Sequence, residues 1–166
     1  MRGGLEQIGR LFDARRQAVA EQLPLGGEII GHPVDHQIAP HALERLCDLN
    51  LRDSSLRIEY CLDTDGFWLE PHTDIGAKLF TMLIYLSDGP GSEAWGTDIL
   101  DGELKLVATS PYRRNLGLIF VPAADTWHGF HKRKIEGVRR SLIVNYVKPE
   151  WRARRELAFP DRPAGS

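Results

Sequence analysis

Hydrophobic residues near the start of the chain follow a helical spacing. Apolar positions separated mostly by three or four residues predict an amphipathic helix, and these positions are Leu5, Ile8, Leu11, Phe12, Val19 and Leu23. Pro24 and the pair Gly26-Gly27 end this helix, and residues 28–40 form a connector with one short strand at Glu28–Ile30. A second helix is expected to begin near Pro40, since proline suits the first helical turn. Its apolar side holds Leu43, Leu46, Cys47 and Leu49.

The pattern becomes strand-like from about Leu56 onward. Short apolar segments alternate with clusters of Gly, Pro, Asp and Ser, as expected of strands joined by turns. The eight segments are Arg57–Leu62, Trp68–His72, Leu79–Leu86, Gly96–Leu100, Leu104–Ala108, Leu116–Val121, Trp127–His131 and Arg139–Val147. No helical pattern separates them, which argues against a parallel sheet. The sequence therefore predicts a mainly β fold, a jelly roll or double-stranded β-helix with N-terminal supporting α-helices.

Length and composition add that these segments belong to one domain. A chain of 166 residues with 42% hydrophobic residues can build a single packed core, and it is too short to build two. We expect residues 1–55 to form a helical support region and 56–148 to form the jelly-roll core. Residues 149–166 contain several arginines and prolines, so they are expected to form a solvated C-terminal tail.

Charge and cysteine content narrow the function classes. The 21 Lys and Arg residues nearly balance 23 Asp and Glu residues, whereas a nucleic-acid-binding protein normally carries an excess of basic residues. The cysteines Cys47 and Cys61 cannot form a disulfide framework or a C-x-x-C metal site. The sequence shows no signal-peptide stretch and no apolar run of membrane-spanning length. We expect a cytoplasmic protein without nucleic-acid or membrane partners. A homodimer is compatible with this expectation.

Candidate chemistry begins with His72 and Asp74 at the end of a predicted strand. Residues two apart on a strand point to the same face, so both side chains would enter one space. From 6 histidines and 23 acidic residues, about one H-x-D or H-x-E triplet is expected by chance, and one is found. The triplet alone therefore does not distinguish a functional site from a chance occurrence.

His128 gives this triplet a context. It lies on the seventh of the eight predicted strands, and in a jelly roll the second and seventh strands can be neighbours. Two imidazoles and one carboxylate on one side of a metal form the facial triad of non-heme Fe(II) oxygenases, which leaves coordination positions open for reactants. The alternative is a surface triplet and an unrelated core histidine.

Arg139 opens the last predicted strand. Alternation places Arg139 and Ser141 on one face and Arg140 on the other. If Arg139 faces the interior, its buried guanidinium requires a bidentate partner such as a carboxylate. A dicarboxylate that meets a metal at one end and Arg139 at the other would supply it. The opposite orientation, with Arg140 inward, remains open.

Three segments together make the chain resemble the iron and 2-oxoglutarate dependent dioxygenases, in particular the prolyl 4-hydroxylase-like branch. They are Pro71-His72-Thr73-Asp74, Trp127-His128-Gly129-Phe130 and Gly137-Val138-Arg139-Arg140-Ser141-Leu142. The resemblance implies catalytic metal ligation of Fe(II) by His72, Asp74 and His128. It also implies that Arg139 binds the C5 carboxylate of the co-substrate 2-oxoglutarate, with O2 as the second reactant and ascorbate as an optional reductant.

Other residues enter through the same resemblance. Ser141 belongs to the R-x-S pattern, while Tyr60 and Tyr85 fall where relatives often place hydroxyls that bind 2-oxoglutarate. Each tyrosine could equally be an ordinary aromatic of a strand. Family members that halogenate typically have a small residue at the position of Asp74, so the resemblance favours hydroxylation.

The resemblance thus implies a dioxygenase that hydroxylates an unactivated C–H bond and releases succinate and CO2. The substrate is expected to be a small molecule or amino-acid-type compound, with a peptidyl substrate still open. Two alternatives remain. One is a non-catalytic jelly roll that binds or senses a small molecule, and the other is a cupin-type metalloenzyme that does not use 2-oxoglutarate.

Overall fold

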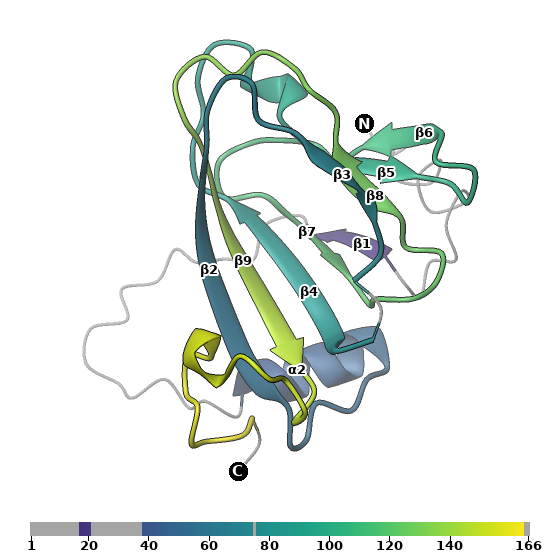
Figure 1. Cartoon of the computed structure of the whole chain (residues 1–166), viewed down its shortest axis with the longest axis vertical. Helices are drawn as coiled ribbons and strands as arrows, with labels where there is room; N and C mark the ends of the chain where they lie inside the picture. The colour runs from purple at the N-terminus through teal and green to yellow at the C-terminus, as the bar shows by residue number, and fades with distance from the viewer. Residues whose placement is uncertain (1–16, 21–37, 75, 165–166) are drawn as a thin grey trace.

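Two antiparallel β-sheets face each other in the computed structural model, which describes residues 17–20, 38–74 and 76–164 (Figure 1). The larger sheet runs, from edge to edge, through β1 (Gln17–Ala20), β7 (Gly117–Phe120), β4 (Lys78–Tyr85), β9 (Arg139–Val147) and β2 (Ser55–Asp63). The smaller sheet contains β3 (Leu69–His72), β8 (His128–Phe130), β5 (Asp98–Leu100) and β6 (Leu106–Thr109). This arrangement confirms the predicted mainly β, jelly-roll fold.

Each of the eight predicted strand segments overlaps a strand of the structure. Strand β9 has the predicted bounds, Arg139–Val147, and pairs with β2 on one side and β4 on the other. Its residues Arg139 and Ser141 are buried while Arg140 is exposed, so the alternation of side chains along the strand decides in favour of Arg139 as the inward residue.

The N-terminal helix is not formed where the structure describes that segment. Residues Gln17–Ala20 are strand β1, which pairs with β7 from Gln17 opposite Phe120 to Ala20 opposite Gly117. The spacing of apolar residues indicates which side chains share a face. It cannot show that a sheet edge elsewhere in the fold has free N–H and C=O groups that accept a further strand. The rest of the predicted helix and the strand at Glu28–Ile30 lie outside the described residues.

The second predicted helix is present as α2 (Ile38–Cys47). Its residues Leu43 and Cys47 pack against a buried cluster on the outer face of the larger sheet, formed by Leu51, Phe80, Ile119 and Tyr146. Figure 1 shows α2 lying across one end of that sheet. No helix of the described part of the chain combines the length and apolarity that a membrane span requires.

The C-terminal segment is mostly exposed to solvent, and it is also anchored to β2 at the edge of the larger sheet. Leu157 forms a β-bridge with Arg57 of β2, and the Ala158 N–H donates to the Leu56 carbonyl at 2.8 Å. The short 3-10 turn η2 (Arg154–Glu156) places Glu156 beside Arg57, with 2.9 Å between Oε2 and Nε. The backbone of β2 at the sheet edge offers hydrogen bonds that a polar composition does not reveal.

A second buried cluster fills the space between the two sheets. It contains side chains from both sheets and from the loops that join them: Leu83, Tyr85, Trp95, Ile99, Tyr112, Leu118, Phe120, Phe130 and Ile135. Trp95 follows the 3-10 turn η1 (Ser92–Ala94), and its indole N–H donates to the Lys134 carbonyl at 3.1 Å. This cluster supports one wall of the pocket described next.

Candidate metal centre

His72 and His128 lie directly opposite each other where β3 pairs with β8. Their ring centroids are 4.3 Å apart. The sheets bring these two residues together because the second and seventh predicted strands are neighbours, as the sequence predicted. Gly129 permits the close approach of β3, since a Cβ there would come within 2.9 Å of the Leu69 carbonyl oxygen.

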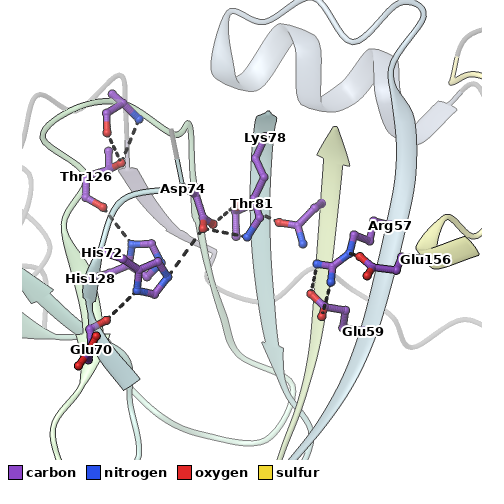
Figure 2. Close-up of polar contacts among 12 residues, drawn as sticks. Arg57, Glu59, Glu70, His72, Asp74, Lys78, Thr81, Thr126, His128 and Glu156 are labelled. Carbon is purple, nitrogen blue, oxygen red and sulfur yellow. Dashed lines mark hydrogen bonds and ion pairs between the residues drawn. The ribbon is translucent and has the colours of Figure 1, made fainter. Parts of the chain in front are cut away.

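Backbone carbonyls hold both imidazoles in the same tautomer. His72 Nδ1 lies 2.8 Å from the Glu70 carbonyl, and His128 Nδ1 lies 2.9 Å from the Thr126 carbonyl (Figure 2). A carbonyl only accepts, so in the neutral ring each Nδ1 carries the proton and Nε2 is the nitrogen left to bind a metal. Fixing the ring through its other nitrogen is a common feature of metal-binding histidines.

Asp74 completes a three-residue cluster. Its Oδ1 lies 3.8 Å from Nε2 of His72, and one ligand atom from each of His72, Asp74 and His128 falls within 4.8 Å of the others. Two imidazole nitrogens and one carboxylate oxygen on one side of a common point match the donor set of the facial triad. The residues present therefore fit a divalent metal such as Fe(II).

Electrostatics favour the metal-binding form of these groups. Burial lowers the pKa of His128, and this effect outweighs the hydrogen bond to Thr126 that raises it. Burial alone would raise the pKa of Asp74, but the hydrogen bond and charge of Lys78, together with His128 and Thr81, lower it overall. At neutral pH the cluster thus offers a neutral imidazole at His128 and an ionised carboxylate, which are the forms that bind metals.

The Asp74 carboxylate is held at both oxygens. Lys78 Nζ lies 2.8 Å from Oδ1, and Thr81 Oγ1 donates to Oδ2 at 2.9 Å (Figure 2). Both partners come from β4, the central strand of the larger sheet. The larger sheet therefore positions the carboxylate, whereas the smaller sheet carries both histidines.

A polar chain continues behind Thr81. Its Oγ1 lies 3.0 Å from Oδ1 of Asn145, which is fully buried and whose Nδ2 has no partner among the described residues. A hydroxyl has one proton to donate, and the Asp74 carboxylate can only accept it. With the Asn145 amide turned over, Nδ2 would donate to Thr81 while Thr81 donates to Asp74, which satisfies both groups.

A pocket of about 110 Å³ lies beside these three ligands, between the two sheets. Side chains of both signs and several apolar groups line it, namely Cys61, Asp63, Phe67, Leu69, Lys78, Thr81, Leu83, Thr97, Phe130, Arg139, Ser141 and Ile143, in addition to the three ligands and Gly129.

Arg139 lines this pocket and is only 5% exposed. Its Nη1 donates to Oδ2 of Asp63, and its Nε donates to the Trp95 carbonyl at 2.8 Å. The guanidinium also lies over the Phe130 ring, 4.8 Å from its centroid. The carboxylate partner that burial requires is thus present within the chain itself. Ser141 is buried and lines the same pocket.

The structure does not bring Tyr60 to this site. Tyr60 lies on the face of β2 opposite to Cys61 and Asp63, and it is 57% exposed. At this end of β2, Cys61 and Asp63 face inward. The alternating residues Ile58, Tyr60 and Leu62 face outward. The geometry therefore gives no support for a role of Tyr60 in binding the co-substrate.

Tyr85 is inside the sandwich but behind the pocket. It is fully buried, and its hydroxyl lies 2.6 Å from Ser110 Oγ and 3.0 Å from Thr97 Oγ1. It is absent from the pocket lining, although its ring lies beside the Arg139 guanidinium, 5.6 Å from centroid to Cζ. The contacts assign Tyr85 to the support of Arg139 rather than to direct contact with a ligand.

Sequence reasoning missed several pocket residues, among them Cys61, Asp63, Lys78 and Thr81. Strand parity could have found two of them, since Thr81 shares the inward face of β4 with Tyr85, and Asp63 lies directly opposite Arg139. Lys78 is found only through its contact with Asp74. Burial raises the pKa of the Cys61 thiol, with help from Glu59 and Asp63.

The remaining histidines lie apart from the cluster or outside the described residues. His131 follows β8, and its ring Nδ1 and backbone N–H both contact Oδ2 of the buried Asp98, at 2.8 and 2.7 Å. His41 lies on α2 with its ring mostly exposed. His32 and His36 fall outside the described residues.

Comparison with known proteins supports the fold. A solved structure of a prolyl-4-hydroxylase from Pseudomonas putida is similar to this chain, with a TM-score of 0.50 and 15% sequence identity. The match covers 65% of this chain and 60% of the hydroxylase chain, so the chain spans less than two thirds of that protein. No protein-family model and no curated protein matches the sequence.

Proposed function

We propose that this chain is an Fe(II)- and 2-oxoglutarate-dependent oxygenase of the prolyl 4-hydroxylase-like branch. It would hydroxylate an unactivated C–H bond of a small molecule or amino-acid-type substrate. The observation that carries the proposal is the convergence of His72, Asp74 and His128, with Nδ1 of each histidine held by a backbone carbonyl.

His72, Asp74 and His128 would hold Fe(II) through two imidazole nitrogens and one carboxylate oxygen. When bound, the metal supplies the activation of O2 that the overall reaction needs. In that reaction the substrate, 2-oxoglutarate and O2 give hydroxylated substrate, succinate and CO2. One oxygen atom enters the substrate and the other enters succinate. The apolar residues Phe67, Leu69 and Phe130 also line the pocket, and with substrate bound they would limit the access of water to the metal.

Arg139 and Ser141 are the residues proposed to bind the distal carboxylate of 2-oxoglutarate. A guanidinium has five N–H donors, and the contacts to Asp63 and Trp95 use two of them. Donors therefore remain for a second carboxylate, although the charge of Asp63 weakens its attraction. The aromatic rings around Arg139 keep it desolvated, which strengthens any ion pair that it forms.

The size of the pocket supports a small co-substrate inside and a primary substrate at its mouth. Its volume of about 110 Å³ lies below the range of roughly 300–1,000 Å³ typical of drug-sized ligands. Most of the primary substrate would therefore lie against the loops around the ligands, with only the reacting carbon near the metal.

The test is succinate formation by the purified full chain with Fe(II), ascorbate and 2-oxoglutarate. We expect slow succinate release without substrate, and loss of this activity in the variant His72→Ala. The matched control His41→Ala removes an exposed histidine on α2 and should leave it unchanged. If the wild-type protein binds neither metal nor 2-oxoglutarate, the proposal fails.

One observation favours a second candidate, a metalloenzyme of the same fold that does not use 2-oxoglutarate. The ion pair with Asp63 already satisfies the charge of Arg139 without any external acid. A metal-binding protein with no measurable affinity for 2-oxoglutarate, by calorimetry in the presence of Mn²⁺, would support this alternative.

A further inference from the structure

Lys78 occupies an unusual position for a cation beside a metal site. Its ammonium lies 2.8 Å from Oδ1 of Asp74, whereas Thr81 donates to Oδ2. Oδ1 is also the oxygen recorded 3.8 Å from Nε2 of His72. Figure 2 shows Lys78 and His72 approaching the same carboxylate from two sides. The lysine therefore contacts the carboxylate oxygen that faces the histidine ligand.

The positive charge of Lys78 opposes metal binding at Asp74 unless a negative charge balances it. A divalent ion bound to Asp74 would lie a few ångströms from the Lys78 ammonium, and like charges at such distances repel strongly where solvent screening is poor. Screening is limited here, since the side chains of Lys78 and Asp74 are 21% and 7% exposed.

The charges of the residues that line the pocket also indicate that a bound metal ion requires a further negative charge. Among the described residues that line it, Asp63 and Asp74 supply two negative charges, and Lys78 and Arg139 supply two positive charges. Asp63 is paired with Arg139, and Asp74 is paired with Lys78. A divalent cation added to this balanced pocket leaves an excess of two positive charges, which anionic ligands would neutralise.

We propose that Lys78 is an anion-binding residue that couples metal affinity to a carboxylate ligand. With metal alone, Lys78 weakens binding. When a carboxylate enters beside the metal, the ammonium turns from Asp74 to that ligand and metal and anion stabilise each other. This deepens the proposed function and rests on its metal site. The carboxylate could belong to the co-substrate or to the primary substrate, and both have the same chemistry.

The first experiment measures Mn²⁺ affinity of the metal-free full chain by calorimetry, without organic anions. The variant Lys78→Met keeps the aliphatic stem and removes the charge, so we expect Mn²⁺ to bind about tenfold more tightly. Lys78→Arg keeps the charge and should resemble the wild type. Lys105→Met removes an exposed lysine paired with Glu103, outside the pocket lining, and should have no effect.

The second experiment repeats the titration with saturating 2-oxoglutarate, and then with acetate added to the 2-oxoglutarate complex. In the wild type we expect the anion to raise Mn²⁺ affinity at least tenfold more than it does in Lys78→Met. If 2-oxoglutarate alone gives this difference, the co-substrate supplies the carboxylate. If only the addition of acetate does so, the carboxylate belongs to the primary substrate.

Three results would overturn the inference. Equal Mn²⁺ affinities in wild type and Lys78→Met would make the ion pair purely structural. Weaker binding in a folded Lys78→Met would make Lys78 a positioning residue for Asp74. Tighter binding with no change in the anion effect would remove the anion from the proposal. Absence of Mn²⁺ binding by the wild type would instead contradict the proposed function itself, so the two failures are distinguishable.

Discussion

Asp63 and Arg139 form an ion pair between directly opposed residues of the β2–β9 ladder, at the side of the pocket lined by Phe130. Both side chains are less than a tenth exposed. Removing one partner of a buried ion pair leaves the other charge without compensation, which is strongly destabilising. The pair therefore links the stability of the fold to the charge that the pocket offers to a ligand.

The variant Asp63→Asn should separate these two effects. We expect the free energy of unfolding to fall by about 3 kcal/mol, because Arg139 loses its buried counter-ion. We also expect 2-oxoglutarate to bind more tightly in the presence of Mn²⁺, since a like charge beside its carboxylate is gone. Urea denaturation and calorimetry measure the two quantities. Asp161→Asn, at an exposed position, is the control, and weaker 2-oxoglutarate binding in Asp63→Asn would contradict this prediction.

Thr81 should act on the metal through Asp74. Thr81→Val keeps the shape of the side chain but removes the hydroxyl that donates to Oδ2. Loss of such an outer contact typically lowers metal affinity about 10–100-fold, and we expect this loss for Mn²⁺. Thr81→Ser retains the hydroxyl and should bind Mn²⁺ nearly as well as the wild type. Equal affinities of the valine and serine variants would show that the hydroxyl does not matter.

Metal binding should raise thermal stability. An ion present at a hundred times its dissociation constant stabilises the folded state by about 2.7 kcal/mol, which corresponds to roughly 5–10 °C for a chain of this size. We expect Mn²⁺ to give this shift in a melting experiment and a chelator to reverse it. His128→Ala should abolish the shift, whereas His131→Ala should retain it. A shift that persists in His128→Ala would place the ion elsewhere.

Asp98 should make the stability depend on pH outside the metal site. Burial acts to raise its pKa, but hydrogen bonds from Arg133 and from the backbone and ring of His131 lower it overall. A carboxyl whose pKa is lower in the folded protein stabilises the fold above its unfolded pKa of about 3.9. That contribution disappears as the pH falls through the lower, folded-state value.

The variant Asp98→Asn tests this dependence. At pH 7 it should be less stable by about 3 kcal/mol, because the buried side chain at position 98 loses the charge that it presents to Arg133 and to the His131 N–H groups. The difference from the wild type should shrink as the pH falls below about 4. Urea denaturation at a series of pH values measures it. A difference that stays constant down to pH 3 would contradict the prediction.

Local sequence determined most of the strands and the candidate metal-binding cluster. Alternation has a short period, so a few residues suffice to show that Arg139 and Ser141 share a face, as they do in the structure. The H-x-D spacing puts His72 and Asp74 near each other through the local chain alone, and the order of strands in a jelly roll supplies the meeting with His128.

Tertiary structure decided which charged residues form pairs. It also decided how residues 17–20 and the C-terminal segment join the larger sheet. The chain at 17–20 became a strand because an open sheet edge was available, although its spacing is helical. Tyr60 faces outward because pairing with β9 turned Asp63 inward. Charged side chains find partners across strands that are distant in sequence, so the pairing of Arg139 with Asp63 depends on register. Lys78 and Asp74 are only four residues apart, and whether their side chains meet depends on the course of the chain between β3 and β4.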